Sequence, residues 1–297
     1  MKSTARPALG RAWRVRLGDL PHARDAADAQ CALHHRAYAH LCARIAEPPP
    51  PPRALEWTDS AADHPLMERA HDPAAVRAQI DMDLARLHVQ VDATARAAVR
   101  RILLVWARVH ALGYQQGMHE LAAMAWCVCA DEADAFALFG ALMRRMADWF
   151  GAAPSLLRAV VHRVDPALAA HLAAERMEWP PLVFRWHRVL YLHEFAFDEA
   201  VRLWDELISA DPSLHLVDYV SAAMVLRVRE QVLTAENGHA PLVLFRWSDA
   251  AARVGRASAA RLVAQAVRLR DAPDVETCAA IVAENADTFR SAISSVH

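Results

Sequence analysis

The sequence has 297 residues, 55% of them hydrophobic, so it holds enough apolar side chain to fill a sizeable core. Its 33 basic and 35 acidic residues give a net charge of −2, which lacks the basic excess that binding to nucleic-acid phosphates requires. Only 8 glycines occur, while alanine, leucine and arginine are abundant, so the composition favours an all-α fold without a sheet.

The N-terminal stretch, residues 1–21, is basic and contains no acidic residue before Asp19, a pattern that weakly resembles a transit peptide. Apolar residues recur at every fourth position, at Leu9, Trp13 and Leu17. This spacing instead favours a first amphipathic helix. The same rule of four predicts a second helix over residues 24–46.

Five consecutive prolines, Pro48 to Pro52, follow that helix. Such a run has no backbone donors and favours the polyproline II conformation, so it ends the helix and acts as a stiff spacer. We therefore expect a proline-rich linker over residues 47–53. A docking site for a proline-binding partner is the alternative.

Helical periodicity resumes near Pro73, with Asp72 as the expected N-cap. Helices are predicted over residues 73–86, 93–112, 120–129, 131–149, 152–164, 166–175, 182–192, 198–208 and 217–233, with shorter ones over residues 242–297. We expect a break at residues 179–181, where two prolines follow a tryptophan, although a helix tolerates proline in its first turn.

The first of two unusual stretches runs from Gln79 to Arg86. Ile80 and Leu84 are one helical turn apart and should face inward. Asp83 and Arg86 are three residues apart, so they should be neighbours on one helix face. Taken alone, this pair has the pattern of an ordinary surface ion pair.

The second stretch, residues 113–121, lies between two strongly apolar helices and contains two glycines and two glutamines. Glycine allows a close backbone approach or a sharp helix start. If Gln116 is buried, its amide needs either an internal partner or a ligand. A helix–helix junction with Gln116 as a capping group is the alternative reading.

Together the two stretches resemble the two signature motifs of the TBC family of Rab GTPase-activating proteins, I-x-x-D-x-x-R and Y-x-Q-G-M. The first is matched by Ile80, Asp83 and Arg86. The second is matched by Tyr114, Gln116, Gly117 and Met118. Residues 181–207 resemble a later signature stretch of the family, and the resemblance extends over about residues 9–247.

The resemblance implies a single multi-helix TBC domain with two helical subdomains, over residues 1–250. Residues 251–297 would be a C-terminal helical extension packed on that domain. GYQQGMHEL, at residues 113–121, is similar to the branch of TBC domain family member five, which is associated with retromer and with late-endosomal and autophagic Rabs. The partners implied are a Rab-family GTPase and, further, retromer subunits.

By this resemblance Arg86 is an arginine finger and Gln116 a second finger, both offered in trans to the GTPase. Asp83 would steer Arg86. The remaining motif residues would support the fingers by packing: Ile80, Tyr114, Gly117 and Met118. GTP and Mg²⁺ arrive with the GTPase, so no cofactor belongs to this chain. The alternatives are a catalytically weak module that acts as a Rab-binding or retromer-binding scaffold, and a helical adaptor unrelated to GTPases.

The sequence gives few signs of other chemistry. Its five irregularly spaced cysteines argue against a disulfide framework or a zinc site, and its 16 histidines lack a ligand spacing and are expected on the surface. No apolar run reaches the roughly 20 residues that a bilayer requires. We therefore expect no direct membrane insertion, and a cytoplasmic protein that reaches endosomal membranes only through its partners.

Overall fold

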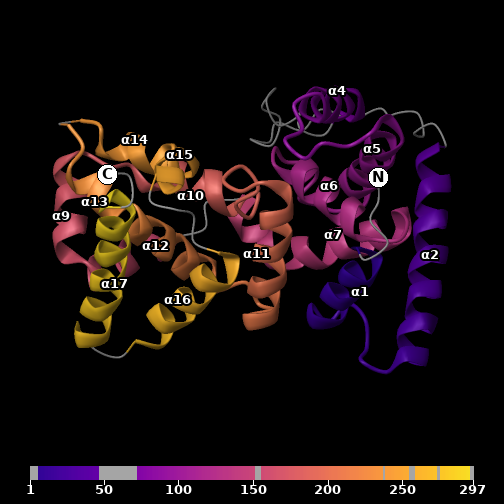
Figure 1. Ribbon diagram of the computed structural model, residues 1–297. Helices are drawn as coiled ribbons and strands as arrows, with labels where there is room; N and C mark the ends of the chain where they lie inside the picture. The colour runs from indigo at the N-terminus through magenta and orange to yellow at the C-terminus, as the bar shows by residue number, and fades with distance from the viewer. Residues whose placement is uncertain are drawn as a thin grey trace, which may run out of the picture. The chain divides into compact units, whose positions relative to one another are not determined.

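The computed structural model describes residues 6–46, 72–150, 155–236, 238–253, 258–272 and 275–294. In these ranges the chain forms helices joined by turns, with no residue in a β-strand, so the predicted all-α fold is confirmed there (Figure 1). The chain divides into two compact units, residues 1–147 and 148–297, in agreement with the predicted two helical subdomains. The predicted linker, residues 47–53 with its proline run, lies outside the described residues.

The helices of the first unit are α1 (Arg6–Arg16), α2 (Arg24–Ala46), α4 (Pro73–Leu84), α5 (Ala93–Val109), α6 (Met118–Val128) and α7 (Glu132–Met146). The 3₁₀ helix η1 (Ala147–Phe150) follows α7 in the chain. Helix α6 packs against α1, α4, α5 and α7, while α2 packs against α5 and α7. The first unit is therefore built around α6.

The apolar sequence of α6 explains its central place. Every residue from Met118 to Ala125 is buried, including the polar His119 and Glu120. A helix that is apolar on all sides can satisfy its surface only in a core. Helix α1 approaches it closely at Gly10, where a β-carbon would lie 2.4 Å from the Val128 carbonyl oxygen and 2.9 Å from Cys129 Sγ. The absence of a side chain at Gly10 thus permits this contact.

The first helices of the second unit are α8 (Leu157–Val164), α9 (Pro166–Ala174), α10 (Trp179–His187), α11 (Phe197–Ala210), α12 (Val217–Arg227) and α13 (Arg229–Leu233). They are followed by α14 (Ala240–Phe245), α15 (Trp247–Arg253), α16 (Ala259–Asp271) and α17 (Val275–Ser294). Helix α12 takes the place in this unit that α6 takes in the first. Its residues Val220 to Leu226 are all buried, and α8, α16 and α17 pack against it.

The C-terminal helices belong to the core of the second unit. Helix α16 packs against both α11 and α12 and buries Leu262, Val263, Ala266 and Leu269. Helix α17 packs against α8, α12 and α13, and its Cys278 and Ile281 are buried. Residues beyond 250 therefore contribute two helices and several buried apolar side chains to the core of this unit.

One predicted helix ends well before the position that its periodicity suggested. The helix expected over residues 182–192 ends at His187, because Leu190 and Tyr191 take positive φ angles of 43° and 64°. Tertiary hydrogen bonds hold that turn: Tyr191 Oη donates to the Val217 carbonyl at 2.6 Å, and Trp204 Nε1 donates to the Leu190 carbonyl at 2.9 Å. These bonds outweigh the local helical pattern.

The expected break at residues 179–181 and the expected helix over residues 217–233 also need correction. Helix α10 starts at Trp179, so Pro180 and Pro181 occupy its first turn, where their missing N–H groups leave no helical bond unmade. The long helix is interrupted at Val228, whose φ of −107° and ψ of 17° leave the helical region, and it continues as α13.

Candidate functional site

The first motif lies at the end of α4. Asp72 caps the helix, since its carboxylate accepts from the Ala74 N–H at 2.9 Å, and Pro73 opens the first turn, as predicted. Ile80 is 0% exposed and anchors the helix to the core. The helix ends at Leu84, two residues earlier than predicted, and Arg86 lies in the turn that follows, exposed to solvent.

Asp83 and Arg86 do not form the surface ion pair that their spacing suggested. Asp83 is 4% exposed, and none of the described carboxylates pairs with the Arg86 guanidinium. Because the helix has ended, Arg86 leaves the face that Asp83 occupies. The Asp83 carboxylate instead accepts from Tyr114 Oη at 2.7 Å and from Gln79 Nε2 at 3.1 Å. A buried carboxylate requires such donors.

The second motif forms a turn that leads into α6. Gly113 and Gly117 have φ angles of 62° and 103°, which favour glycine, and Gly117 is the N-cap of α6. Met118 is 0% exposed, and its sulfur accepts from the Gln115 N–H at 3.3 Å. Gln116 is exposed, so it is not the buried amide that the apolar surroundings suggested.

The two motifs are tied together on both sides of Arg86. Upstream of Arg86, the Tyr114 hydroxyl is bound to Asp83. Downstream, Glu120 Oε1 accepts from the His88 N–H at 2.7 Å and Glu120 Oε2 from the Val89 N–H at 3.3 Å. The Arg86 turn is therefore fixed at both ends by residues that flank Gln116.

His119 and Glu120 are supporting residues that the sequence analysis did not select. Glu120 is 1% exposed, and His119, which was expected on the surface with the other histidines, is 7% exposed. His119 Nδ1 lies 3.0 Å from Tyr114 Oη and accepts from the Gly117 N–H at 3.3 Å. The available signal was position, since two polar residues at the start of an otherwise apolar, buried helix must find hydrogen-bond partners inside the protein.

Tyr114 is more than the packing residue that the sequence suggested, because its hydroxyl is a fixed donor. Burial raises the pKa of this hydroxyl well above its usual range, and the hydrogen bond to Asp83 raises it further. The proton therefore stays on Tyr114, as the bond to a carboxylate requires.

The site can be described as two exposed polar side chains on a buried polar frame. Arg86 and Gln116 reach solvent. The frame consists of the residues whose contacts fix the two turns, namely Asp83, Tyr114, Gly117, His119 and Glu120. A guanidinium and an amide presented in this way can bind a phosphate group and a water molecule of an approaching partner.

One group of described side chains is close enough to hold a cation, namely His35, Asp131 and Asp134, whose ligand atoms lie within 4.8 Å of one another. These carboxylates already have structural partners. Asp131 caps α7 by accepting from the Asp134 N–H at 2.9 Å, and Asp134 accepts from the buried guanidinium of Arg14. Over the described ranges, no helix combines the length and apolar character that crossing a bilayer requires.

Comparison with known proteins adds an independent observation. Residues 54–233, more than half of the chain, match the model of the Rab-GTPase-TBC domain family. TBC1 domain family member 5 of Homo sapiens is 27% identical over 225 residues, which cover 54% of this chain and 28% of that protein. TBC1 domain family member 13 of Homo sapiens is 26% identical over 160 residues, covering 46% of this chain and 40% of that protein.

A shorter match, to TBC1 domain family member 5 homolog B of Dictyostelium discoideum, is 30% identical over 83 residues and covers 28% of this chain and 8% of that protein. The chain thus spans well under half the length of these relatives. Their identities are similar, so they do not distinguish the member five branch from the others.

Solved structures share the fold. The Ypt/Rab-GAP domain of Gyp1p aligns with a TM-score of 0.67 at 18% identity, over 88% of this chain and 87% of that one. The TBC domain of the Chlamydomonas flagellar RabGAP aligns with a TM-score of 0.62 at 19% identity, over 88% of this chain and 80% of that one.

Proposed function

Since this chain belongs to the Rab-GTPase-TBC domain family, we propose that it stimulates GTP hydrolysis by a Rab-type small GTPase. The observation that carries the proposal is the joint fixing of two exposed side chains. Arg86 and Gln116 both reach solvent, from turns that Tyr114 and Glu120 tie together. Two fingers that act on one nucleotide need this kind of common anchor.

Arg86 acts on charge. Hydrolysis of GTP passes through a loose transition state that places negative charge on the phosphate oxygens, and an arginine offered in trans accelerates the reaction about 10³- to 10⁵-fold. This corresponds to about 4 to 7 kcal/mol of barrier. The planar guanidinium keeps its charge and can contact two oxygens at once, which lysine cannot do.

Gln116 acts on geometry. Its amide oxygen can accept a hydrogen bond from the attacking water while its amino group donates toward the phosphate, which fixes an in-line approach. Asp83 and Tyr114 hold the two turns in register rather than touching the nucleotide. GTP and Mg²⁺ come with the GTPase in this mechanism.

A finer proposal concerns the place of action. The GYQQGMHEL stretch at residues 113–121 and the match to TBC1 domain family member 5 support a role in endosomal vesicle trafficking, with retromer subunits as further partners. In the alternative reading, the chain binds a Rab or retromer as a scaffold with weak catalysis. The exposure of both Arg86 and Gln116 favours the catalytic reading.

The test is single-turnover GTP hydrolysis by a panel of Rabs, with the wild type, Arg86→Ala, Arg86→Lys and Gln116→Ala. We expect the Arg86→Ala change to lower the stimulated rate about 10²-fold or more, with Rab binding largely kept. Arg86→Lys should lose most of the stimulation as well, because an ammonium group cannot contact two phosphate oxygens as the planar guanidinium does. Arg96→Ala, which removes another exposed arginine of the first unit, is the matched control and should keep full stimulation.

Equal stimulation by the wild type and all the variants would refute the two-finger mechanism. Rab binding without any stimulation by the wild type would leave the scaffold reading. A pulldown with purified retromer subunits tests the finer proposal separately.

A further inference from the structure

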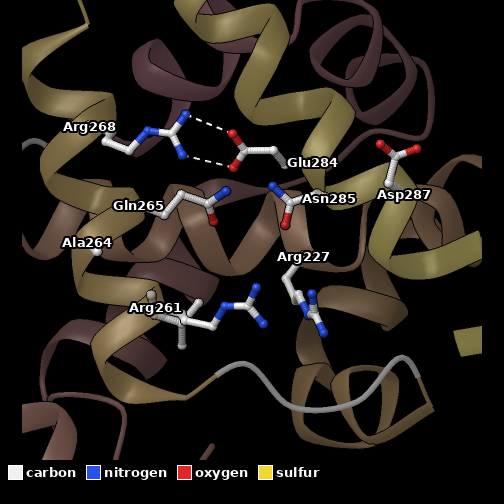
Figure 2. A pocket seen from close by; sticks show the side chains of 9 residues that line it. Arg227, Arg261, Ala264, Gln265, Arg268, Glu284, Asn285 and Asp287 are labelled. Carbon is white, nitrogen blue, oxygen red and sulfur yellow. Dashed lines mark hydrogen bonds and ion pairs between the residues drawn. The ribbon is translucent and has the colours of Figure 1, made fainter. Parts of the chain in front are cut away.

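The second unit contains a cavity of about 490 Å³ between the end of α12, α16 and α17 (Figure 2). Its polar lining comes from Arg227, Arg261, Gln265, Arg268, Glu284, Asn285 and Asp287. Asp287 accepts a hydrogen bond from Arg290. This volume is in the range of sites that bind small molecules, and well above what a single water or inorganic ion fills. Arg86 and Gln116 belong to the first unit, so this cavity is a separate feature.

The arginines that line the cavity have different partners. Arg268 forms a two-pronged ion pair with Glu284, with N–O distances of 2.8 and 2.9 Å, which leaves that carboxylate satisfied. In Figure 2, Arg261 from α16 and Arg227 from α12 extend their guanidinium groups toward the same part of the cavity. None of the described carboxylates pairs with Arg261.

The two cations therefore face each other across the cavity. Burial lowers the pKa of Arg227, and the like charge of Arg261 lowers it further. Burial and the neighbouring positive charge both make the charged form of Arg227 less favourable, although arginine stays charged in proteins. An anion placed between the two guanidinium groups would relieve their repulsion and replace lost hydration.

Two amides complete the lining. Gln265 from α16 and Asn285 from α17 face each other next to the arginine pair (Figure 2). Asn285 is 6% exposed and is held by its bond from Nδ2 to the Ile281 carbonyl at 2.8 Å. Amides can donate to or accept from the hydroxyl groups of a sugar or polyol.

We propose that this cavity binds a small phosphorylated anion, with its phosphate between Arg227 and Arg261 and its polyol part against Gln265 and Asn285. Guanidinium groups match phosphate with paired hydrogen bonds, which explains why two arginines, rather than lysines, point into the space. The cavity is large enough for more than the phosphate alone. A soluble phosphorylated metabolite and a phosphorylated lipid headgroup share this chemistry.

The test is calorimetric titration of the full chain with a soluble inositol trisphosphate, and with inositol as the ligand that lacks phosphate. We expect binding of the trisphosphate alone, weakened about tenfold or more in Arg261→Gln, because a charge-assisted hydrogen bond to phosphate is lost. Arg227→Gln should weaken binding similarly. Since Arg227 is partly buried, the exposed Arg261 is the decisive position.

Arg270→Gln is the matched control, since Arg270 is also on α16 but pairs with Asp271 and does not line the cavity. It should bind as the wild type does. No binding of the trisphosphate, equal binding by Arg261→Gln, or an equal loss in Arg270→Gln would overturn the proposal. Sedimentation with phosphatidylcholine vesicles, with and without a phosphoinositide, then separates the sources: Arg261-dependent binding to the phosphoinositide vesicles assigns the lipid headgroup, and its absence assigns the soluble metabolite.

Discussion

Asp83 illustrates how a short motif can place a buried structural residue close to an exposed one. Its carboxylate is buried and would be costly to desolvate without partners. Tyr114 and Gln79 supply donors, and the bond to Tyr114 crosses between the two motifs. The charge of Asp83 therefore serves the shape of the site, while Arg86 is exposed to solvent.

Tyr114→Phe should lower the free energy of unfolding by about 1.5 to 3 kcal/mol, because it removes a hydrogen bond to a buried carboxylate. Urea unfolding followed by circular dichroism measures this change. Tyr219→Phe is the control, since none of the described groups is bonded to the Tyr219 hydroxyl, and it should change stability little. Equal effects of the two substitutions would contradict the role given to the Tyr114–Asp83 bond.

His187, which was expected on the surface, is 2% exposed and should make stability depend on pH. Burial lowers the pKa of His187 to about 4 from an ordinary 6.5, although the carboxylate of Asp218, 4.0 Å away, acts in the opposite direction. Below pH 6.5 the unfolded chain binds a proton that the folded chain does not. The stabilisation is therefore complete above about pH 6.5 and is lost as pH falls toward 4, by about 3 kcal/mol in all.

His187→Gln should flatten this pH dependence, because glutamine does not titrate and can still donate to Ser221, which lies 2.9 Å from His187 Nε2. Urea midpoints measured between pH 7.5 and 4.5 compare the two proteins. Other groups titrate in both, so the difference between the curves isolates His187. Parallel curves would show that His187 contributes nothing.

Among the helices, the contact of α1 with α6 depends on a single missing side chain. Gly10→Ala would place a β-carbon 2.4 Å from the Val128 carbonyl oxygen, which is backbone and cannot easily move. We expect a loss of about 1 to 3 kcal/mol in unfolding free energy. Thermal denaturation of the wild type and Gly10→Ala measures whether the substitution lowers the melting temperature, as expected.

Gly140→Ala provides the counterpart within the same unit. Its β-carbon would meet only Arg144 at 3.7 Å and Trp106 at 3.8 Å, which are ordinary contacts. Because alanine favours the helix, stability should stay the same or rise by up to about 1 kcal/mol. Destabilisation by both substitutions to the same degree would mean that helix packing in the first unit is not what Gly10 controls.

Helix periodicity predicted much of the secondary structure because most helices bury one face. The range 24–46 was predicted as observed, and the starts at Pro73, Ala93 and Pro166 were also correct. The errors fall where tertiary contacts decide. The turn after His187 depends on the hydroxyl of Tyr191 and the indole of Trp204, which come together only in the folded unit.

The site was only partly predictable for the same reason. The resemblance to the TBC motifs singled out Arg86 and Gln116, whereas spacing along the chain paired Asp83 with the wrong residue. Tyr114 lies 31 residues from Asp83 in the chain, and Glu120 lies 32 residues from His88, so no local pattern links them. Sequence alone thus selected these two residues, but it predicted neither the exposure of Gln116 nor the contacts that fix the backbone of the two turns.

At the scale of the whole molecule, each unit surrounds one apolar helix, α6 or α12, with others that cover it. Shortening the chain should therefore be damaging wherever a covering helix is lost. A chain that ends at Arg253 lacks α16 and α17, which bury four large apolar side chains, Leu262, Val263, Leu269 and Ile281. At about 1.5 to 3 kcal/mol each, this loss approaches the entire stability of an ordinary domain.

We expect such a chain to lose cooperative unfolding of its second unit, which near-ultraviolet circular dichroism reports through the buried Trp186, Trp204 and Trp247. A chain that ends at Ala272 keeps α16, so its second unit should lose less stability than that of the chain ending at Arg253. Unchanged tryptophan signals in the shorter chain would show that the C-terminal helices are an appendage rather than part of the core.

The hydrogen bonds that fix the Arg86 turn on both sides have a kinetic consequence. In the proposed mechanism, the backbone of this turn is already in place when a GTPase arrives, and only the Arg86 side chain of the turn remains to be immobilised. That step forfeits about 2 kcal/mol of rotamer entropy, whereas ordering a loop forfeits 1 to 2 kcal/mol for each residue. If the chain acts on a GTPase as proposed, a brief and weak encounter would suffice for insertion of the guanidinium, and rapid turnover over many GTPase molecules would be compatible with a modest dissociation constant.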